Sequence, residues 1–261
     1  MTNQKPDRKG LAMSRNNGIF TVMFFCATLL LTITVGSVSA KAQSAAAATK
    51  SDIIAIDISL APDETMIKHA AADNARLLKV FPKGYSLDAT HRPHITLVQR
   101  FVHRADLERI YAAVGKVIVS SNVTSMKLEA FKYYYAPGGE LGVAGICARP
   151  TPEILKLQAD VIAAVTPFVV ATGPITAFTA PQATAALDAD LIDYVTTFVP
   201  KMSGANFNPH VSIGVAPRTY LDKMIAEPFT TFTFSPVGAN VYHLGPYGTA
   251  AVKLQEWRPK P

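Results

Sequence analysis

Two short segments, far apart in the sequence, share one pattern of side chains. Each has Pro-His, then an apolar residue, a hydroxyl residue and a second apolar residue. They are Arg92-Pro93-His94-Ile95-Thr96-Leu97 and Asn208-Pro209-His210-Val211-Ser212-Ile213. Successive side chains of a strand point to opposite faces, so His94 shares a face with Thr96. His210 shares a face with Ser212 for the same reason. A fold that brings the two strands together would direct two imidazoles and two hydroxyls into one cleft.

These residue types favour acid/base chemistry. Histidine has an unperturbed pKa of about 6.5, so it can act as a base or as an acid near neutral pH. A covalent nucleophile at Thr96 or Ser212 is disfavoured, because no acidic residue near either motif could orient a base. A zinc site is disfavoured as well, since neither motif contains Asp, Glu or Cys. We therefore expect no metal and no cofactor. A purely structural role for both motifs is the least favoured interpretation, because the pattern is repeated.

The two motifs resemble the signature of the two-histidine (2H) phosphoesterases, a family that includes 2′,3′-cyclic phosphodiesterases and 2′-5′ RNA ligase-like proteins. That signature is a pair of His-x-[Thr/Ser]-hydrophobic motifs, matched here by residues 94–97 and 210–213. The resemblance covers residues 53–261, and residues 244–249 look like the last hairpin of the family. It implies a single bilobed, internally duplicated α+β domain. Two antiparallel sheets would face each other, with outer helices and one motif on each lobe.

The resemblance also implies an activity. It is metal-independent hydrolysis of 2′,3′-cyclic phosphates on nucleotides or RNA ends, with 2′-5′ RNA ligase-like activity as a further expectation. Of His94 and His210, one would be neutral and the other protonated, and the sequence leaves open which is the acid. Thr96 and Ser212 would donate hydrogen bonds to the phosphate oxygens. The alternative is a non-catalytic nucleotide- or RNA-binding module with the same cleft. We expect a monomer that forms no stable nucleic-acid complex.

Residues 1–40 are typical of a secretory signal peptide. A basic leader precedes an apolar run at 19–35, and small residues follow at 38–40. An uncleaved membrane anchor is the alternative, because the apolar run approaches the length of a spanning helix. Residues 41–52 lack periodicity and are expected to be a flexible linker. We therefore expect a secreted or periplasmic protein that is free of the membrane after cleavage.

The charge and the cysteine content indicate which ligands and which covalent cross-links to expect. The net charge is +6, and the leader holds four basic residues and one acidic residue, which leaves +3 for the remainder. Such a mild charge favours an anionic ligand without a broad nucleic-acid-binding surface. Cys147 is the one cysteine after the leader, so no internal disulfide is expected there. Its apolar neighbours indicate a buried, unreactive thiol.

Periodicity and turn signals predict strands and helices that alternate, with hairpins between some of them. Strands are expected at 53–60, 94–101, 126–135, 141–148, 207–215, 231–234, 241–244 and 250–257. Helices are expected at 64–80, 104–119, 151–165, 183–198 and 219–226. The stretch 172–203 is long for a compact family member, and substrate choice is expected to reside there.

A few further side chains are candidates for contacts in the cleft. Tyr133, Tyr134 and Tyr135 follow one another, so two of them share a face of their strand. Packing is favoured for these tyrosines over stacking on a nucleobase. Arg100 and Arg149 are further candidate partners of the phosphate, but nothing in the sequence indicates that they lie near the two motifs.

Overall fold

The computed structural model describes residues 52–182 and 184–258. The expected signal peptide and nearly all of the expected linker lie outside the described residues. Within the described ranges, no helix combines the length and the apolar composition that a membrane crossing would need. The described residues belong to one compact unit.

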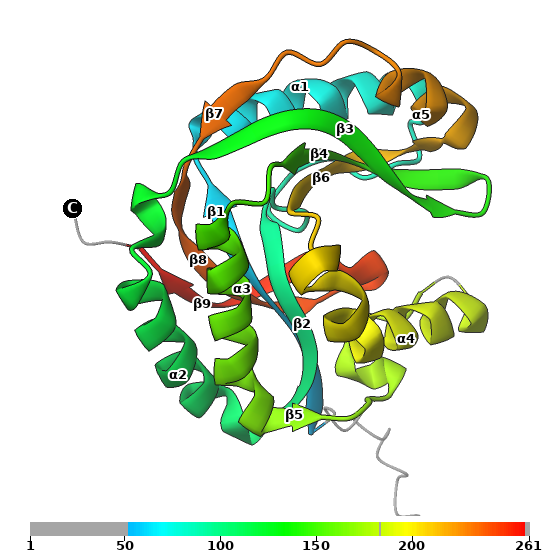
Figure 1. Cartoon of the computed structure of the whole chain (residues 1–261). Coiled ribbons are helices and arrows are strands. Elements are labelled where there is room, and N and C mark those ends of the chain that lie inside the picture. The colour runs from blue at the N-terminus through cyan, green and yellow to red at the C-terminus, as the bar shows by residue number, and fades with distance from the viewer. Residues whose placement is uncertain (1–51, 183, 259–261) are drawn as a thin grey trace, which may run out of the picture. The chain divides into compact units, whose positions relative to one another are not determined.

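The described chain contains the predicted mixture of strands and helices (Figure 1). The strands are β1 (Ile53–Pro62), β2 (Ile95–His103), β3 (Leu128–Gly138), β4 (Leu141–Ala148), β5 (Val169–Val170), β6 (His210–Pro217), β7 (Phe232–Phe234), β8 (Pro236–Leu244) and β9 (Ala250–Trp257). The α-helices are α1 (Glu64–Val80), α2 (Leu107–Ser120), α3 (Pro152–Val165), α4 (Ala185–Met202) and α5 (Arg218–Ile225). The short strand β5 and the first half of β8 were not expected from the sequence. The α+β class is confirmed.

The strands form one antiparallel sheet in the order β7-β3-β4-β6-β2-β1-β8-β9, with β5 paired to β2. The order divides this sheet into two halves, β7-β3-β4-β6 and β2-β1-β8-β9. These halves correspond to the two expected sheets, and they are joined where Ile95 of β2 pairs with Val211 of β6. The join lies inside both His-containing motifs. The fold therefore brings the two motifs to the middle of the sheet.

The two motif strands carry the same irregularity, which supports an internal duplication. In β2 the register shifts after Thr96, so that Leu97 has no partner on β1. In β6 it shifts after Ser212, so that Ile213 has no partner on β4. A β-bulge of this kind turns the side chains that follow it toward the other face of the strand. Each motif thus ends in a bulged aliphatic residue.

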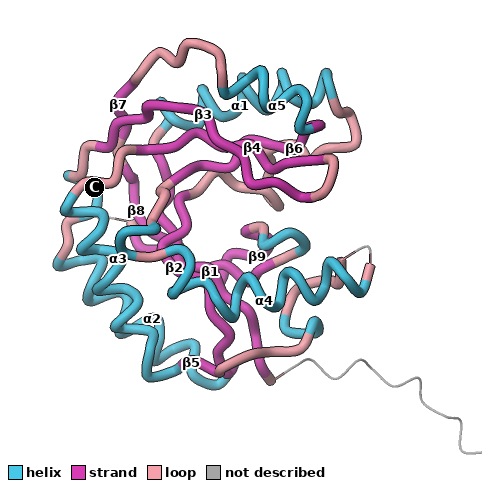
Figure 2. The backbone as a smooth tube through the Cα atoms, turned by 45° about the vertical axis from the view of Figure 1, so that its right-hand side comes forward, coloured by secondary structure: helices cyan, strands magenta, loops and turns pink. Residues whose placement is uncertain are grey.

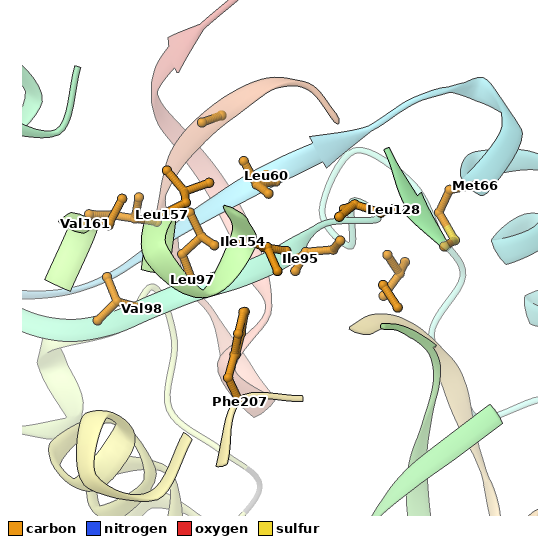
Figure 3. Packing of buried hydrophobic residues seen from close by; sticks show 14 of the residues in the cluster. Leu60, Met66, Ile95, Leu97, Val98, Leu128, Ile154, Leu157, Val161 and Phe207 are labelled. Carbon is orange, nitrogen blue, oxygen red and sulfur yellow. The ribbon is translucent and has the colours of Figure 1, made fainter. Parts of the chain in front are cut away.

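Helices cover the outer faces of both halves (Figures 1 and 2). Helices α1 and α5 pack against β6 and its neighbours, whereas α2 and α3 pack against each other and against β9 and β2. Asp63 caps α1, as expected, by accepting hydrogen bonds from the backbone N–H groups of Thr65 and Met66. Figure 3 shows Ile154 and Leu157 of α3 packed beside Leu97 of the motif strand. The aliphatic side of the first motif is therefore anchored in the core.

Alternation along β1 separates the core from the site. Ile54, Ile56 and Ile58 are fully buried in the main apolar core. The intervening side chains point to the opposite face, where Ala55 belongs to a smaller apolar cluster with residues of α4. Further along that face the side chains become polar at Asp57, which is also fully buried. The apolar strand thus places one carboxylate next to the motif strands.

Candidate active site

The pairing of β2 with β6 brings all four predicted site residues together. Because the strands are antiparallel and Ile95 lies opposite Val211, their register sets the neighbours of each motif residue. These neighbouring pairs are His94 with Ser212 and Thr96 with His210. The two histidines are then diagonal neighbours, at a typical separation of about 7 to 8 Å between backbone positions. The two motifs therefore form one site.

Both histidines are oriented by a carbonyl of their own motif. The Nδ1 atom of His94 lies 2.6 Å from the Arg92 carbonyl oxygen, and that of His210 lies 2.8 Å from the Asn208 carbonyl oxygen. In each motif the carbonyl belongs to the residue before proline, which proline restricts to an extended conformation. A carbonyl only accepts, so both Nδ1 atoms carry a proton. The Nε2 atom is left for chemistry in both rings.

A buried carboxylate distinguishes the two histidines. The Nε2 atom of His94 lies 3.3 Å from Oδ2 of Asp57, and the Asp57 side chain has no exposed surface. The same Oδ2 accepts hydrogen bonds from the Thr96 hydroxyl at 2.9 Å and from the Gln99 amide at 3.3 Å. No comparable carboxylate contact is found for His210 in the part of the chain that the structure describes. The expectation that no acidic residue accompanies either motif is wrong for His94, because Asp57 arrives from another strand.

The bulge in β2 explains how Asp57 reaches so many partners. Asp57 pairs with Gln99, and Ser59 pairs with Thr96, although Thr96 and Gln99 are an odd number of residues apart. Strict alternation would place Thr96 and Gln99 on opposite faces. The bulge at Leu97 returns them to the same face. Both can therefore donate to one carboxylate oxygen.

The environments of the histidines move their pKa values in opposite directions. For His94, burial alone would lower the pKa, but the Asp57 carboxylate and the Arg92 carbonyl together raise it. For His210, burial is again the largest cause and lowers the pKa, with the Asn208 carbonyl opposing it. Positive charge on His94 lowers the pKa of His210 further. His94 is therefore the group that favours the protonated form, and His210 favours the neutral form.

The two hydroxyls also differ in their bonding. The Thr96 hydroxyl donates its hydrogen bond to Asp57. Within the described residues the Ser212 hydroxyl makes no side-chain hydrogen bond, and the residue is only partly buried. Ser212 can donate to an incoming oxygen at once, whereas Thr96 must first exchange its bond to Asp57.

Each histidine has a tyrosine ring beside it. The ring of Tyr134 lies 4.9 Å from that of His210, and the ring of Tyr242 lies 6.1 Å from that of His94, both measured between centroids. Burial raises the pKa of Tyr134, and it raises that of Tyr242 to about 12, so both phenols are neutral. Tyr133 and Tyr135 instead bond to Asp73 and Asp222 at the helix-covered side. Packing is thus confirmed for two of the three consecutive tyrosines, while Tyr134 lies at the site.

A glycine makes room for the His210 and Tyr134 rings. Gly145 of β4 pairs with Tyr134 on one side and with Ser212 on the other. A Cβ atom at this position would lie 3.2 Å from Cδ2 of His210 and 3.3 Å from Cδ1 of Tyr134. Those distances are shorter than ordinary van der Waals contact, so the rings depend on the missing side chain.

Helix α4 and the turn between β8 and β9 lie next to the face of the sheet that carries Asp57 and Gln99. Tyr194 of α4 interacts electrostatically with Asp57 and Tyr134, and burial raises its pKa. The Gln99 amide, besides contacting Asp57, donates to the carbonyl of Gly248 in the turn at 3.3 Å. Helix α4 lies within the stretch expected to influence substrate choice. Sequence reasoning did not single out Asp57, Gln99 or Tyr194.

The two arginines named as candidate phosphate partners form their hydrogen bonds with groups other than the histidines. Arg100 donates to the Thr196 carbonyl, and Arg149 pairs with Glu129. Cys147 is fully buried, as expected, and burial raises its pKa. Across residues 52–182 and 184–258, no group of three or more His, Cys, Asp or Glu side chains has an arrangement that could hold a metal ion.

Comparison with known proteins gives structural likeness without sequence likeness. No protein-family model matches the chain, and no curated protein does. The solved structures similar to it include TT0787 of Thermus thermophilus, with 15% identity, a TM-score of 0.46, and coverage of 78% of this chain and 97% of that one. They also include Escherichia coli LigT complexed with 3′-AMP, with 10% identity, a TM-score of 0.38, and coverage of 80% and 99% respectively.

A third similar structure is that of Kluyveromyces marxianus Usb1 with uridine monophosphate. It has 13% identity and a TM-score of 0.39, with 78% of this chain and 97% of that chain covered.

Proposed function

We propose that this protein is a two-histidine phosphoesterase that hydrolyses 2′,3′-cyclic phosphates of nucleotides or RNA ends. The observation that carries the proposal is the pair of histidines from separate strands, which meet in one site with opposite preferences for the proton. Two titratable groups whose environments separate their pKa values are suited to act as acid and base in one reaction. A binding module would not need that separation.

The different environments of the two histidines support one assignment of the roles that the sequence left open. His210 is the base: its Nδ1 proton is held by the Asn208 carbonyl, so neutral His210 has its lone pair on Nε2. His94 is the acid, because Asp57 favours a proton on its Nε2 atom. Each role contributes on the order of 10² to 10⁴ to the rate in typical enzymes.

The hydrolysis then takes place through two proton transfers. Nε2 of His210 takes a proton from water while the water oxygen forms a bond to phosphorus. The bond from phosphorus to one ribose oxygen breaks, and that oxygen takes the proton from Nε2 of His94. The product is a nucleoside monophosphate, with His210 protonated and His94 neutral until solvent restores both. In 2′-5′ ligase-like activity a 5′-hydroxyl of a second RNA would replace the water, with the same two histidines.

We assign Ser212 and Thr96 to the phosphate oxygens. Hydroxyl donors in a partly buried site stabilise the negative charge that accumulates on those oxygens during the reaction. Ser212 donates without losing a bond, and Thr96 exchanges its bond to Asp57 for one to the phosphate. The ring of Tyr134 lies beside that of His210, and Tyr194 interacts electrostatically with Tyr134 and Asp57; both rings offer surfaces on which a nucleobase can stack. Helix α4, which carries Tyr194, is accordingly proposed to influence which base is accepted.

We further propose that the enzyme acts after export, as a secreted or periplasmic monomer. The support is the leader at residues 1–40, with its basic start, apolar run and small residues. Mass spectrometry of the protein purified from its host tests this directly. A new N-terminus near residue 41 is the expected result, and an intact N-terminus in a membrane fraction would contradict it.

The decisive test of the activity uses 2′,3′-cyclic nucleotides in the presence of EDTA. The wild-type protein should turn them over, and His94→Ala and His210→Ala should each lower kcat on the order of 10²-fold or more. His103→Ala is the matched control, because His103 lies at the exposed end of β2 and contacts Asp52 on the surface. Turnover that survives in either site variant contradicts the proposal, and loss of wild-type turnover with EDTA would indicate a metal-dependent reaction. Nucleotide binding without any turnover would identify a binding module.

A further inference from the structure

The two halves of the sheet are alike around each motif, but one pair of matching positions differs in charge. Counting from each histidine, Gln99 corresponds to Val215, and the partners of these residues across the sheet are Asp57 and Val143. The internal duplication therefore places a buried carboxylate beside the first motif and an aliphatic side chain at the matching place beside the second. This charge difference gives the two histidines different electrostatic environments.

A carboxylate in this place is energetically expensive without a positive partner. Asp57 is fully buried, and its Oδ1 atom has no hydrogen-bond partner among the described residues. No Lys or Arg forms an ion pair with it anywhere in the described ranges, so His94 is its one ionic contact there. A buried charge is tolerated when it is paired and hydrogen-bonded. Here the pairing requires that His94 carries its second proton.

We propose that Asp57 is a positioning residue that keeps a proton on Nε2 of His94 and thereby makes His94 the acid of the pair. The inference rests on the proposed function for its catalytic meaning. The Nε2–Oδ2 distance of 3.3 Å is longer than a typical charge-assisted hydrogen bond, and Oδ2 already accepts from Thr96 and Gln99. The proton is therefore favoured by the charge of Asp57 without being bound tightly, and it remains available to a leaving oxygen.

The same contact resets the site after turnover. Once His94 has given up its proton, a neutral imidazole lies next to an unpaired buried carboxylate, which favours uptake of a proton from solvent. The positive charge on His94 in turn favours the neutral form of His210. One carboxylate thus biases both histidines toward the forms that a new cycle needs.

The other ionisable groups around the pair do not supply this bias. Tyr242 of β8 and Tyr194 of α4 both interact electrostatically with Asp57, but burial raises the pKa of each phenol and keeps it neutral. His210 of β6 contributes a positive charge only when it is protonated, and Arg92 contacts His94 through its backbone carbonyl. Asp57 is the negative group in direct contact with His94.

The test is an NMR titration of the histidine rings in the wild-type protein and in Asp57→Asn. In the wild type, His94 should titrate above the ordinary histidine pKa of about 6.5, and His210 below it. In Asp57→Asn the pKa of His94 should fall, and that of His210 should rise because the neighbouring charge is lost. Asp52→Asn is the matched control, since Asp52 contacts exposed His103 at 3.2 Å and should leave both site histidines unchanged.

The kinetic counterpart is the pH profile of kcat/KM. In Asp57→Asn the alkaline limb should move to lower pH and the acidic limb to higher pH, which lowers kcat/KM at pH 8 on the order of tenfold. A merely structural role would lower activity equally at all pH values. An unchanged His94 titration in a folded Asp57→Asn protein would overturn the inference. If that variant does not fold, a wild-type titration with His94 at or below His210 would overturn it. The titration needs no substrate, so a shifted His94 without turnover would refute the proposed function alone.

Discussion

Ile95 and Val211 are paired across the sheet at the one point where the described strands β2 and β6 meet. Each lies directly after the histidine of its motif, with its side chain in the core and the histidine on the opposite face. The two halves of the sheet are thus joined by the same residues that place the two histidines. Stability of this junction and geometry of the site are linked.

The junction predicts a large stability effect from one substitution. Ile95 is 1% exposed and packs in the main core, so Ile95→Ala should lower the free energy of unfolding by about 2 to 5 kcal/mol. Chemical denaturation monitored by circular dichroism measures it. Val119→Ala is the control, because Val119 is 78% exposed on α2 and should change stability little. Equal effects of the two substitutions would argue against the packing described here.

The opposite environments of the histidines predict a broad pH optimum. In the proposed mechanism His210 must be neutral, so kcat/KM should rise with pH through a pKa below the ordinary histidine value. The mechanism also requires protonated His94, so kcat/KM should fall with rising pH through a pKa above that value. A plateau around neutral pH lies between the two limbs. A single narrow maximum, with both limbs near the ordinary value, would contradict the assigned environments.

The two hydroxyls should respond differently to removal. Ser212 has no internal bond to lose, so Ser212→Ala should lower kcat/KM roughly tenfold to a hundredfold, the effect of one hydrogen bond to a charged group. Its effect on stability should be small. Thr96→Val leaves the buried Asp57 without one donor and should lower the free energy of unfolding by about 1 to 3 kcal/mol. Steady-state kinetics and denaturation on both variants test the distinction, which identical responses would refute.

Gly145 predicts a purely geometric effect on catalysis. In Gly145→Ala the new methyl group would press on the rings of His210 and Tyr134 and on the carbonyl oxygen of Val211, so these groups must move by a few tenths of an ångström. Small misplacements of catalytic groups slow reactions, and we expect kcat to fall on the order of tenfold with the fold retained. Gly138→Ala, in the same hairpin, meets no atom closer than 4.0 Å and serves as the control. Full activity of Gly145→Ala would show that the His210 ring is not confined there.

Local patterns in the sequence predict much of this site. Strand alternation gives the shared face of His94 and Thr96, and the repeated motif indicates that two such strands belong together. The helix cap at Asp63 and the hairpin between β3 and β4 follow from equally local signals. These features depend on residues close in the chain, which is why the sequence reveals them.

The difference between the two histidines depends on residues far apart in the chain, and the sequence does not predict it. The two histidines have neighbours of the same types in their motifs, so the acid and the base cannot be told apart from those residues. The difference arises because β1 pairs with β2 in a register, altered by a bulge, that brings Asp57 to His94. One signal was available: Asp57 is a single charged residue in a strand that is otherwise almost wholly apolar. An isolated charge in a buried strand indicates a buried partner.

In the proposed mechanism, His94 and His210 act as one acid/base unit on a cyclic phosphate. The most direct measurement compares turnover of a 2′,3′-cyclic nucleotide by the wild type, His94→Ala, His210→Ala and the double variant. Groups that act as a unit are strongly non-additive, so the double variant should be about as slow as the slower single variant. Losses that multiply in the double variant, or substantial turnover in either single variant, would show that the two histidines do not work together.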